Sequence, residues 1–325
     1  MIFETSNILS AIQPTFILSK ILGLRPAISI LKSGMKIKKF GYIYSILLYL
    51  AYMIIYFSSG QRSYMKFFKQ SILVKASKKF MEFGTIVIMT GILGISCYNQ
   101  RGLFKCIKRI IRIDATLSDM NIRVSYTRAK CVSILMICII CVFDILLNYV
   151  IILSFSNKND LTILIPTAKL FLPRFIVSQV VSEFLIIQMI LHDHFKTVNY
   201  KIATINEEMC KGTLDALFPK RAFLTKINNL NKTHFNIKLN ALFDLHDELC
   251  DLCKEINALY SLSLLIITTL AFADTTINLY VSTLAFISMD NKTFSVAFVA
   301  NRIYRTVINA GIFIALSAGS SFTAN

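Results

Sequence analysis

The sequence predicts an all-α membrane protein, a bundle of helices that crosses the bilayer several times. Apolar residues make up 55% of the 325 residues, and charged residues only 16%, against roughly 25% in soluble globular proteins. The apolar residues are gathered into stretches that carry few or no charges and reach the roughly 20 residues that a helix needs to cross a bilayer. This composition excludes a soluble enzyme, a collagen, a coiled coil and a disordered chain, and it makes the lipid bilayer the first expected partner.

Six stretches are predicted to span the membrane. The first two carry no charge, the third carries only Asp144, the fourth only Glu183 and the fifth only Asp274. The sixth contains Arg302 and Arg305 ahead of its apolar part, so its signal is the weakest. The predicted spans are residues 41–60, 83–100, 131–157, 175–191, 256–289 and 293–318.

The distribution of basic residues predicts the orientation. The chain carries a net charge of +17, and an N-terminus inside the cell places 23 of its Lys and Arg residues in cytosolic segments and 9 in external loops. The Asn-Lys-Thr sequon at Asn231 is then cytosolic and should carry no glycan. The expected organisation is a cytosolic N-terminal segment (1–40), four spans with their loops (41–191), a cytosolic helical anchor segment (192–255) and two spans with a cytosolic C-terminal end (256–325).

The second half of the anchor segment has the spacing of a helix. Leucines and isoleucines from Leu242 to Leu259 alternate steps of three and four, and no Gly or Pro interrupts the run into the fifth span, so one continuous rod is predicted. A second stripe follows the same spacing, and its small and polar side chains are expected to pack against neighbouring helices. A structural zinc site usually needs four ligands in a turn-forming arrangement, so no metal is expected there. The stripe is His246, Cys250, Cys253, Asn257 and Ser261.

Catalytic motifs do not occur in the chain. It contains no glycine-rich phosphate loop, no paired catalytic carboxylates and no metal motif, so neither an enzyme nor a bound cofactor is expected. Residues 192–194 read His-Asp-His and are predicted to cap the cytosolic end of the fourth helix. The basic excess is explained by the membrane topology, and a nucleic-acid partner is not expected.

Two stretches resemble a known family, the insect gustatory receptors. The run "LHDELCDLCKEINALYSLSLL" (Leu245 to Leu265) and the following "TTINLYVS" (Thr275 to Ser282) are similar to the signature before and within the fifth span of that family, and "ILGLRPAISI" (Ile21 to Ile30) is similar to its N-terminus. The matching signature positions are His246, Leu249, Cys250, Ile256, Asn257 and Ser261.

This resemblance implies a tetrameric, ligand-gated cation channel of the plasma membrane, built from one or several receptor subunits, whose outer half binds a small-molecule tastant. It also implies a seventh span that lines the pore and carries a Thr-Tyr and a Gln-Phe element. Neither dipeptide occurs in this sequence, which stops at Asn325 just after the sixth predicted span. We therefore expect a chain truncated before the seventh span, with the pore residues absent from it.

Polar residues inside the spans are the candidates for ligand binding. Ionisable groups within a membrane are costly and face a cavity or a partner. The alternative is that Asp144 pairs with Arg174, and Asp274 with Arg302 or Arg305, only to join helices. The proposed ligand residues are Asp144, Asn148, Arg174, Asp274, Asn278 and Arg302.

Several other functions are compatible with the sequence. The chain could be a subunit similar to an insect odorant receptor, a secondary transporter with intramembrane carboxylates, a G-protein-coupled receptor, or a fragment that regulates full-length receptors. The two halves share no internal repeat of the kind common in transporters, and the predicted orientation opposes a G-protein-coupled receptor. The stripe on the predicted rod favours taste over smell.

Overall fold

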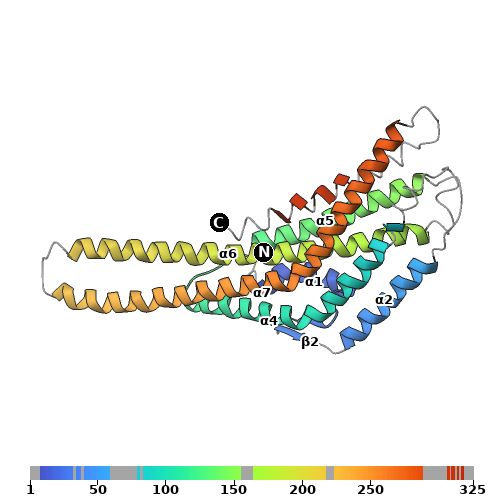
Figure 1. The fold of residues 1–325 in the computed structure, drawn as a ribbon. Coiled ribbons are helices and arrows are strands. Elements are labelled where there is room, and N and C mark those ends of the chain that lie inside the picture. Colours follow the sequence, from blue (N-terminus) through green and yellow to red (C-terminus); the bar gives the residue numbers. More distant parts are fainter. Residues whose placement is uncertain are drawn as a thin grey trace.

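A computed structural model shows an elongated bundle of helices (Figure 1). It describes residues 8–31, 34–37, 40–58, 79–80, 83–154, 164–216 and 223–287, and short helical pieces at 306–307, 309–311, 313–314 and 316–317. The predicted helical membrane bundle is confirmed. Its elements are α1 (Ile8–Ile21), β1 (Ile28–Leu31), β2 (Gly34–Ile37), α2 (Phe40–Ser58), η1 (Ile88–Ile92), α4 (Leu93–Asp119), α5 (Thr127–Ser154), α6 (Leu164–Ala216) and α7 (Phe223–Ile287).

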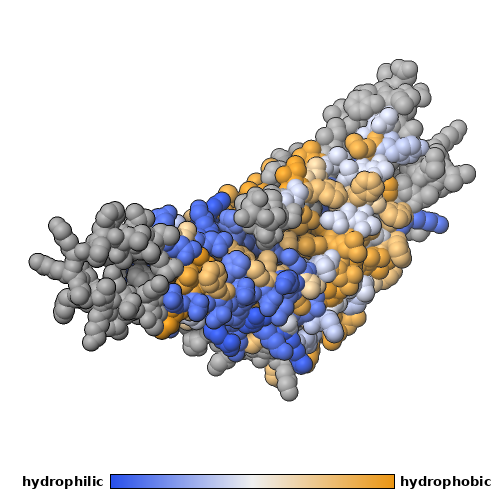
Figure 2. Space-filling model, turned by 60° about the vertical axis from the view of Figure 1, so that its left-hand side comes forward, coloured by the Kyte–Doolittle hydropathy of each residue, from blue (hydrophilic) through white to orange (hydrophobic). Residues whose placement is uncertain are grey.

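Three helices of the described part contain stretches long and apolar enough to cross a membrane. They are Phe40–Phe57 in α2, Leu172–Glu207 in α6 and Asn236–Tyr280 in α7. The surface divides in the same way: Figure 2 shows hydrophobic residues gathered over one end of the bundle and hydrophilic residues over the part nearer the long helical pair. A bilayer covers such an apolar end, whereas water solvates the rest.

Helices α6 and α7 form the long axis of the molecule. They lie side by side over much of their length and extend together beyond the other helices (Figure 1). The predicted unbroken rod is observed, since α7 runs from Phe223 to Ile287 without interruption. Leu242, Leu249 and Ile256 of the predicted seam are fully buried, so the seam supplies the apolar contact that joins α7 to the bundle.

The N-terminal segment is part of the bundle. Helix α1, which the sequence did not predict, packs against α5 and α6 and buries Ile8, Ile12 and Phe16. After α1 the chain turns at Gly23, whose φ of +74° lies in the left-handed region that favours glycine. A Cβ at Gly41 would meet the backbone of Ala27, so this segment and the start of α2 approach too closely for a larger residue.

Two short strands connect α1 to α2. Strands β1 and β2 pair antiparallel, with Ile28 opposite Ile37 and Leu31 opposite Gly34. This hairpin was not predicted either. It returns the chain to the start of α2 after only a few residues, and so it keeps the α1 segment next to the bundle that α2 then enters.

The second predicted span is a helix with one wide turn. A π-helical segment, η1, leads directly into α4, and π-helical turns inside longer helices occur often at functional sites. The α4 residues that follow bury Leu103, Ile107, Ile110 and Leu117, at steps of three, four and seven residues. These side chains form the buried face of α4, and α4 meets α7 through the neighbouring Asn99, Gly102 and Cys106.

Candidate functional site

A buried ion pair lies at the centre of the bundle. The Arg25 Nε lies 3.3 Å from Glu183 Oε2, and both side chains are almost fully buried, with exposed fractions of 4% and 0%. The Tyr260 hydroxyl donates to the same carboxylate oxygen over 3.2 Å, and the guanidinium carbon of Arg25 lies 5.6 Å from the centre of the Tyr260 ring. We call Arg25, Glu183 and Tyr260 the Arg25 cluster. It joins the N-terminal segment to α6 and α7.

Further hydrogen bonds attach the N-terminal segment to α4. The Arg25 Nη1 donates to the Ser96 carbonyl over 2.7 Å, and the Ala27 amide donates to Gln100 Oε1 over 3.1 Å. Ser96 and Gln100 lie one turn apart on the same face of α4. A single arginine of the N-terminal segment therefore holds α4, α6 and α7 in register.

Helix α1 is held on α6 by a glutamine. The Gln179 Nε2 donates to the Thr15 carbonyl over 2.8 Å and to the Ser19 Oγ over 2.7 Å. Gln179 is one turn before Glu183, so the two side chains share a face of α6. Together they fix both α1 and the turn that follows it.

A second polar cluster lies nearer the long helical pair, outside the predicted spans. The Tyr126 hydroxyl donates to Asp114 Oδ1, and its oxygen lies 3.0 Å from His194 Nε2. The other ring nitrogen of His194, Nδ1, donates to the Ile190 carbonyl over 2.8 Å. We call Asp114, Tyr126 and His194 the Tyr126 cluster. It joins α4, the connection before α5, and α6.

Burial controls the ionisation of this cluster. Desolvation raises the pKa of Tyr126, and its hydrogen bond to the Asp114 carboxylate raises it further. Desolvation also lowers the pKa of His194, against the hydrogen bond to Ile190 and the charges of Asp114 and Asp193, which raise it. Tyr126 is therefore a neutral donor, and burial disfavours the charged form of the His194 imidazole.

The His-Asp-His segment is not a helix cap. Helix α6 continues for more than twenty residues beyond it, to Ala216. The prediction that residues 192–194 cap the end of this helix is therefore wrong, and the reason is that the helix does not end with the apolar run. His194 instead faces α4 and the start of α5 through Tyr126.

The signature stripe on α7 faces α6 along part of its length. The Gln188 Nε2 donates to Asn257 Oδ1 over 2.8 Å, and Cys253 Sγ lies 3.9 Å from Gln188 Oε1. The His246 ring packs edge-on against Phe195, with 5.5 Å between ring centres. The prediction that the stripe packs against a neighbouring helix is confirmed for these residues.

The rest of the signature divides between packing and the surface. Leu249 and Ile256 are fully buried in the seam, and Cys250 Sγ lies 3.9 Å from His246 Nδ1 within α7 itself. Ser261 is exposed, and its hydroxyl donates to the Ala258 carbonyl one turn earlier. Within the described chain, no group of three or more His, Cys, Asp or Glu side chains could hold a metal ion.

A partly exposed ion pair lies on the other side of α7. The Arg109 Nη1 lies 2.8 Å from Glu255 Oε1, and its Nε lies 3.4 Å from Glu248 Oε1. The neighbouring Cys106 thiol also approaches Glu255, and burial together with that carboxylate raises the pKa of Cys106 to about 11. The thiol is therefore protonated and unreactive at neutral pH.

The structure brings together part of the predicted ligand set. Asn309 Nδ2 donates to Asp274 Oδ2 over 2.9 Å, so the sixth predicted span meets α7 there. Asn278 is fully buried one turn further along α7, whereas Arg174 is half-buried on α6. The side chains of Asp144, Asn148, Arg302 and Arg305 lie outside the described residues, as do the pairings predicted for them.

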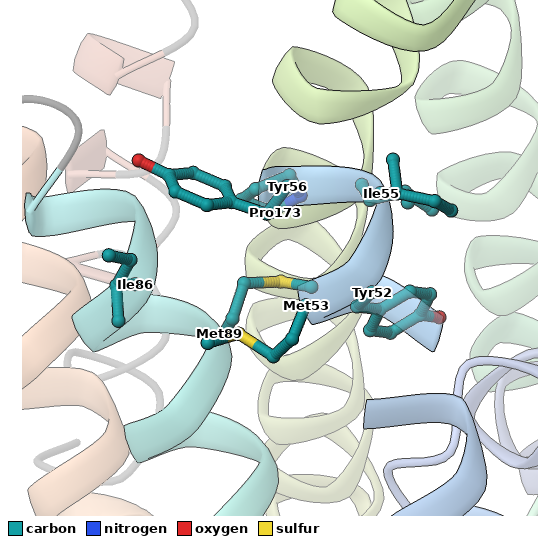
Figure 3. A pocket seen from close by; sticks show the side chains of 8 residues that line it. Tyr52, Met53, Ile55, Tyr56, Ile86, Met89 and Pro173 are labelled. Atoms are coloured by element: carbon teal, nitrogen blue, oxygen red, sulfur yellow. The ribbon is translucent and has the colours of Figure 1, made fainter. Parts of the chain in front are cut away.

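A crevice opens between α2, the helix around η1, and α6. Figure 3 shows the thioethers of Met53 and Met89 side by side, with Tyr56 above them and Tyr52 beside them. Ile55, Ile86, Leu172 and Pro173 complete its walls. Tyr49 and Thr90, which neighbour the lining residues in sequence, join α2 to η1 through their hydroxyls, 3.1 Å apart. The cavity volume of the crevice is only about 10 Å³, roughly the space of one water molecule, so the side chains on its walls nearly fill it.

Sequence reasoning did not find this crevice. Tyr49, Tyr52 and Tyr56 recur at steps of three and four along the first span, which indicates a shared helix face. That spacing does not reveal which helix lies opposite, and the π-helical turn that brings Met89 into the wall has no sequence signal of its own.

These features define a polytopic helical membrane protein whose polar groups lie between helices, with no constellation for catalysis among the described residues. The chain matches the model of the 7tm chemosensory receptor family over residues 12–325, and it belongs to that family, the superfamily of insect gustatory and odorant receptors. A search of curated proteins finds no match. The protein is thus a membrane chemoreceptor, in a family that is generally non-enzymatic.

Proposed function

We propose that the protein is a gustatory receptor: a subunit of a tetrameric plasma-membrane cation channel that opens when a small-molecule tastant binds. The observation that carries the choice of taste over smell is the signature stripe on α7. Asn257 and Cys253 of this stripe contact Gln188 of α6, near the point where the apolar part of α6 and α7 ends and the long rod begins. The same stripe supports an anchor role for the paired rods, with both chain ends in the cytosol.

The tastant is proposed to bind among the polar residues that the sequence singles out. Asp274 and Asn278 lie one turn apart on α7, and Asp274 already bonds to Asn309 from the last predicted span. Arg174, Asp144, Asn148 and Arg302 complete the proposed set. Carboxylate, amide and guanidinium groups would recognise hydroxyl or amine groups of a small ligand.

Ion conduction needs the pore helix that the family resemblance implies. No stretch of this sequence carries the Thr-Tyr and Gln-Phe elements of that helix. The channel proposal is therefore tested first by reading the transcript through the codon for Asn325. A frame that continues into a seventh apolar span with both elements supports conduction by this chain. A stop codon directly after Asn325 contradicts it and leaves a regulatory role alongside full-length receptors.

The ligand site is tested by expressing that reading frame in cells and recording cation currents against sugars, bitter compounds and amino acids. Asp274→Ala should shift the concentration for half-maximal response at least tenfold at unchanged surface expression. Asp251→Ala is the matched control, because Asp251 lies on the same helix with its side chain 64% exposed. An unchanged response in Asp274→Ala would remove Asp274 from the site. Absence of a glycan at Asn231 would support the proposed orientation.

A further inference from the structure

Several buried polar atoms around the Arg25 cluster have no hydrogen-bond partner among the described residues. The second carboxylate oxygen of Glu183, Oε1, is the most notable, since the residue is charged and fully buried. Buried polar groups in folded proteins are almost always satisfied, by protein or by ordered water. The atoms are Ser96 Oγ, Gln100 Nε2, Gln179 Oε1, Ser182 Oγ and Glu183 Oε1.

These atoms belong to one region of the bundle. The guanidinium of Arg25 donates to Glu183 Oε2 with Nε and to the Ser96 carbonyl with Nη1, so one planar group spans the two residues. Gln100 lies one turn beyond Ser96 and holds the Ala27 amide, two residues after Arg25. Ser96, Gln100, Gln179 and Glu183 thus each bond to the N-terminal segment as well as carrying an unsatisfied atom.

The charge of the Arg25 cluster limits which kind of molecule could bond to the unsatisfied polar atoms. Arg25 and Glu183 balance each other, and the Tyr260 hydroxyl adds a neutral donor. A cation at Glu183 Oε1 would be repelled by the guanidinium beside it, whereas water can donate to the carboxylate and bond to a serine hydroxyl at the same time. Buried water typically makes about three hydrogen bonds to otherwise unsatisfied groups.

We propose that the bundle holds ordered water at the Arg25 cluster, with one molecule that donates to Glu183 Oε1 and bonds to Ser96 Oγ. This water completes the solvation of a carboxylate that Arg25 and Tyr260 satisfy on one oxygen only. The N-terminal segment, α4, α6 and α7 then meet at a hydrated ion pair and not at a dry one.

Radiolytic footprinting of the purified full chain in lipid nanodiscs tests the proposal. Hydroxyl radicals formed from bound water oxidise the side chains beside it, and Tyr260, which is almost fully buried, bonds to Glu183. We expect Tyr260 to be oxidised, and Ser96→Ala to lower its oxidation rate at least threefold. Oxidation of Tyr126, an equally buried tyrosine outside the Arg25 cluster, should not change. An unoxidised Tyr260, or equal rates in both proteins, would overturn the proposal.

Ser133→Ala is the matched control variant. Ser133 is a buried serine on α5 whose hydroxyl also has no partner among the described residues, and the hydrogen bonds of the Arg25 cluster described above come from other elements. The Tyr260 rate should therefore remain at the wild-type value in this variant. If Ser133→Ala lowered the oxidation rate of Tyr260 as much as Ser96→Ala, the loss of any buried serine would have this effect. That result would overturn the assignment of the water to Ser96.

A density map provides the direct measurement and does not depend on any variant. A cryo-electron microscopy map at a resolution that shows ordered water should contain a peak within about 2.6–3.2 Å of Glu183 Oε1. The peak should be present both in sodium buffer and in a buffer whose only cation is choline. No peak, or a peak present only with sodium, would overturn the proposal, the latter in favour of a bound cation.

Discussion

The Arg25 cluster and the Tyr126 cluster both tie α4 to α6, but they do so with different chemistry. The first is an ion pair between two almost fully buried side chains, at the level of the predicted fourth span. The second is a chain of hydrogen bonds through a neutral tyrosine hydroxyl, beyond the end of that span. Removing one partner therefore leaves an uncompensated charge in the first cluster, but only an unsatisfied polar group in the second.

The two clusters therefore differ in how much the bundle depends on keeping both partners of a contact. A buried ion pair contributes little net stability, because desolvation of both charges offsets their attraction, yet breaking it is costly. The Arg25 cluster therefore enforces one arrangement of the N-terminal segment more than it adds stability. The Tyr126 cluster joins α4 to α6 beyond the apolar part of the bundle. Because it contains His194, its contribution to stability depends on pH.

The largest effect should follow from Glu183→Leu. This change leaves the Arg25 guanidinium buried without its carboxylate, at a cost of roughly 3–5 kcal/mol. The double variant Arg25→Met with Glu183→Leu removes both charges and should recover at least half of the loss. Thermal unfolding of the detergent-purified protein, followed by size-exclusion chromatography, measures both.

The double variant shows whether the loss of stability comes from breaking the ion pair or from removing each side chain on its own. If it is as unstable as the sum of the two single variants, the interaction between Arg25 and Glu183 contributes nothing of its own, and the contrast between the two clusters fails. Gln188→Leu is a suitable reference, because Gln188 is buried on the same helix but neutral, and it should cost less than Glu183→Leu.

A smaller loss is expected from Tyr126→Phe. The ring and its packing remain, while the bonds to Asp114 and His194 are lost, so stability should fall by about 1–3 kcal/mol. The same unfolding assay measures it. A loss as large as that of Glu183→Leu would show that Asp114 behaves as a buried charge without compensation, and would remove the distinction between the clusters.

Acidification should weaken the Tyr126 cluster. Burial lowers the pKa of His194 below its ordinary value of 6.5, so the folded chain binds fewer protons than the unfolded chain as the pH falls below 6.5. The stability from this residue is complete above 6.5 and is lost, by up to about 1.4 kcal/mol per pH unit, as the pH falls toward the folded pKa. Unfolding of the wild type and of His194→Gln, compared between pH 7.5 and pH 5.5, measures the contribution of His194.

The wild type should therefore lose more stability than His194→Gln over this interval. Burial also raises the pKa of Asp193, opposed by the charges of Arg128, His192, His194 and Lys196, so the comparison includes the effect of His194 on Asp193. A wild type that gains stability relative to the variant would mean that the folded cluster retains a proton on His194 Nε2, donated to the Tyr126 oxygen.

The sequence was sufficient for the class of fold and for the long rod. Uncharged runs and the leucine seam from Leu242 to Leu259 report directly on burial, because each depends only on local spacing. Helix α1 and the hairpin were missed, since Pro14 and the short strands give weak local signals and their positions depend on contacts with α5, α6 and α2.

The polar sites show the same limit. Glu183 stood out as the lone charge of its span, but its partner Arg25 is 158 residues away, in a segment predicted to be cytosolic. The rule that an intramembrane charge needs a partner could have prompted the pairing, although it does not say which of many arginines serves. His194 was misassigned because the end of an apolar run is not the end of a helix, and α6 continues to Ala216.

The smallest effect should come from Arg109→Ala, which removes an ion pair that water reaches. Arg109 is 27% exposed and Glu255 is 53% exposed, so solvent screens both contacts and their loss should cost less than about 1 kcal/mol. Raising the salt concentration from 50 to 500 mM should reduce the difference between Arg109→Ala and the wild type, while it leaves the loss in Glu183→Leu unchanged. A salt-independent loss above 2 kcal/mol would show instead that Arg109 is desolvated in the assembled protein. In that case the exposed fraction of an ion pair would not predict its contribution to stability, and the face of α7 on which the pair lies would have to be considered instead.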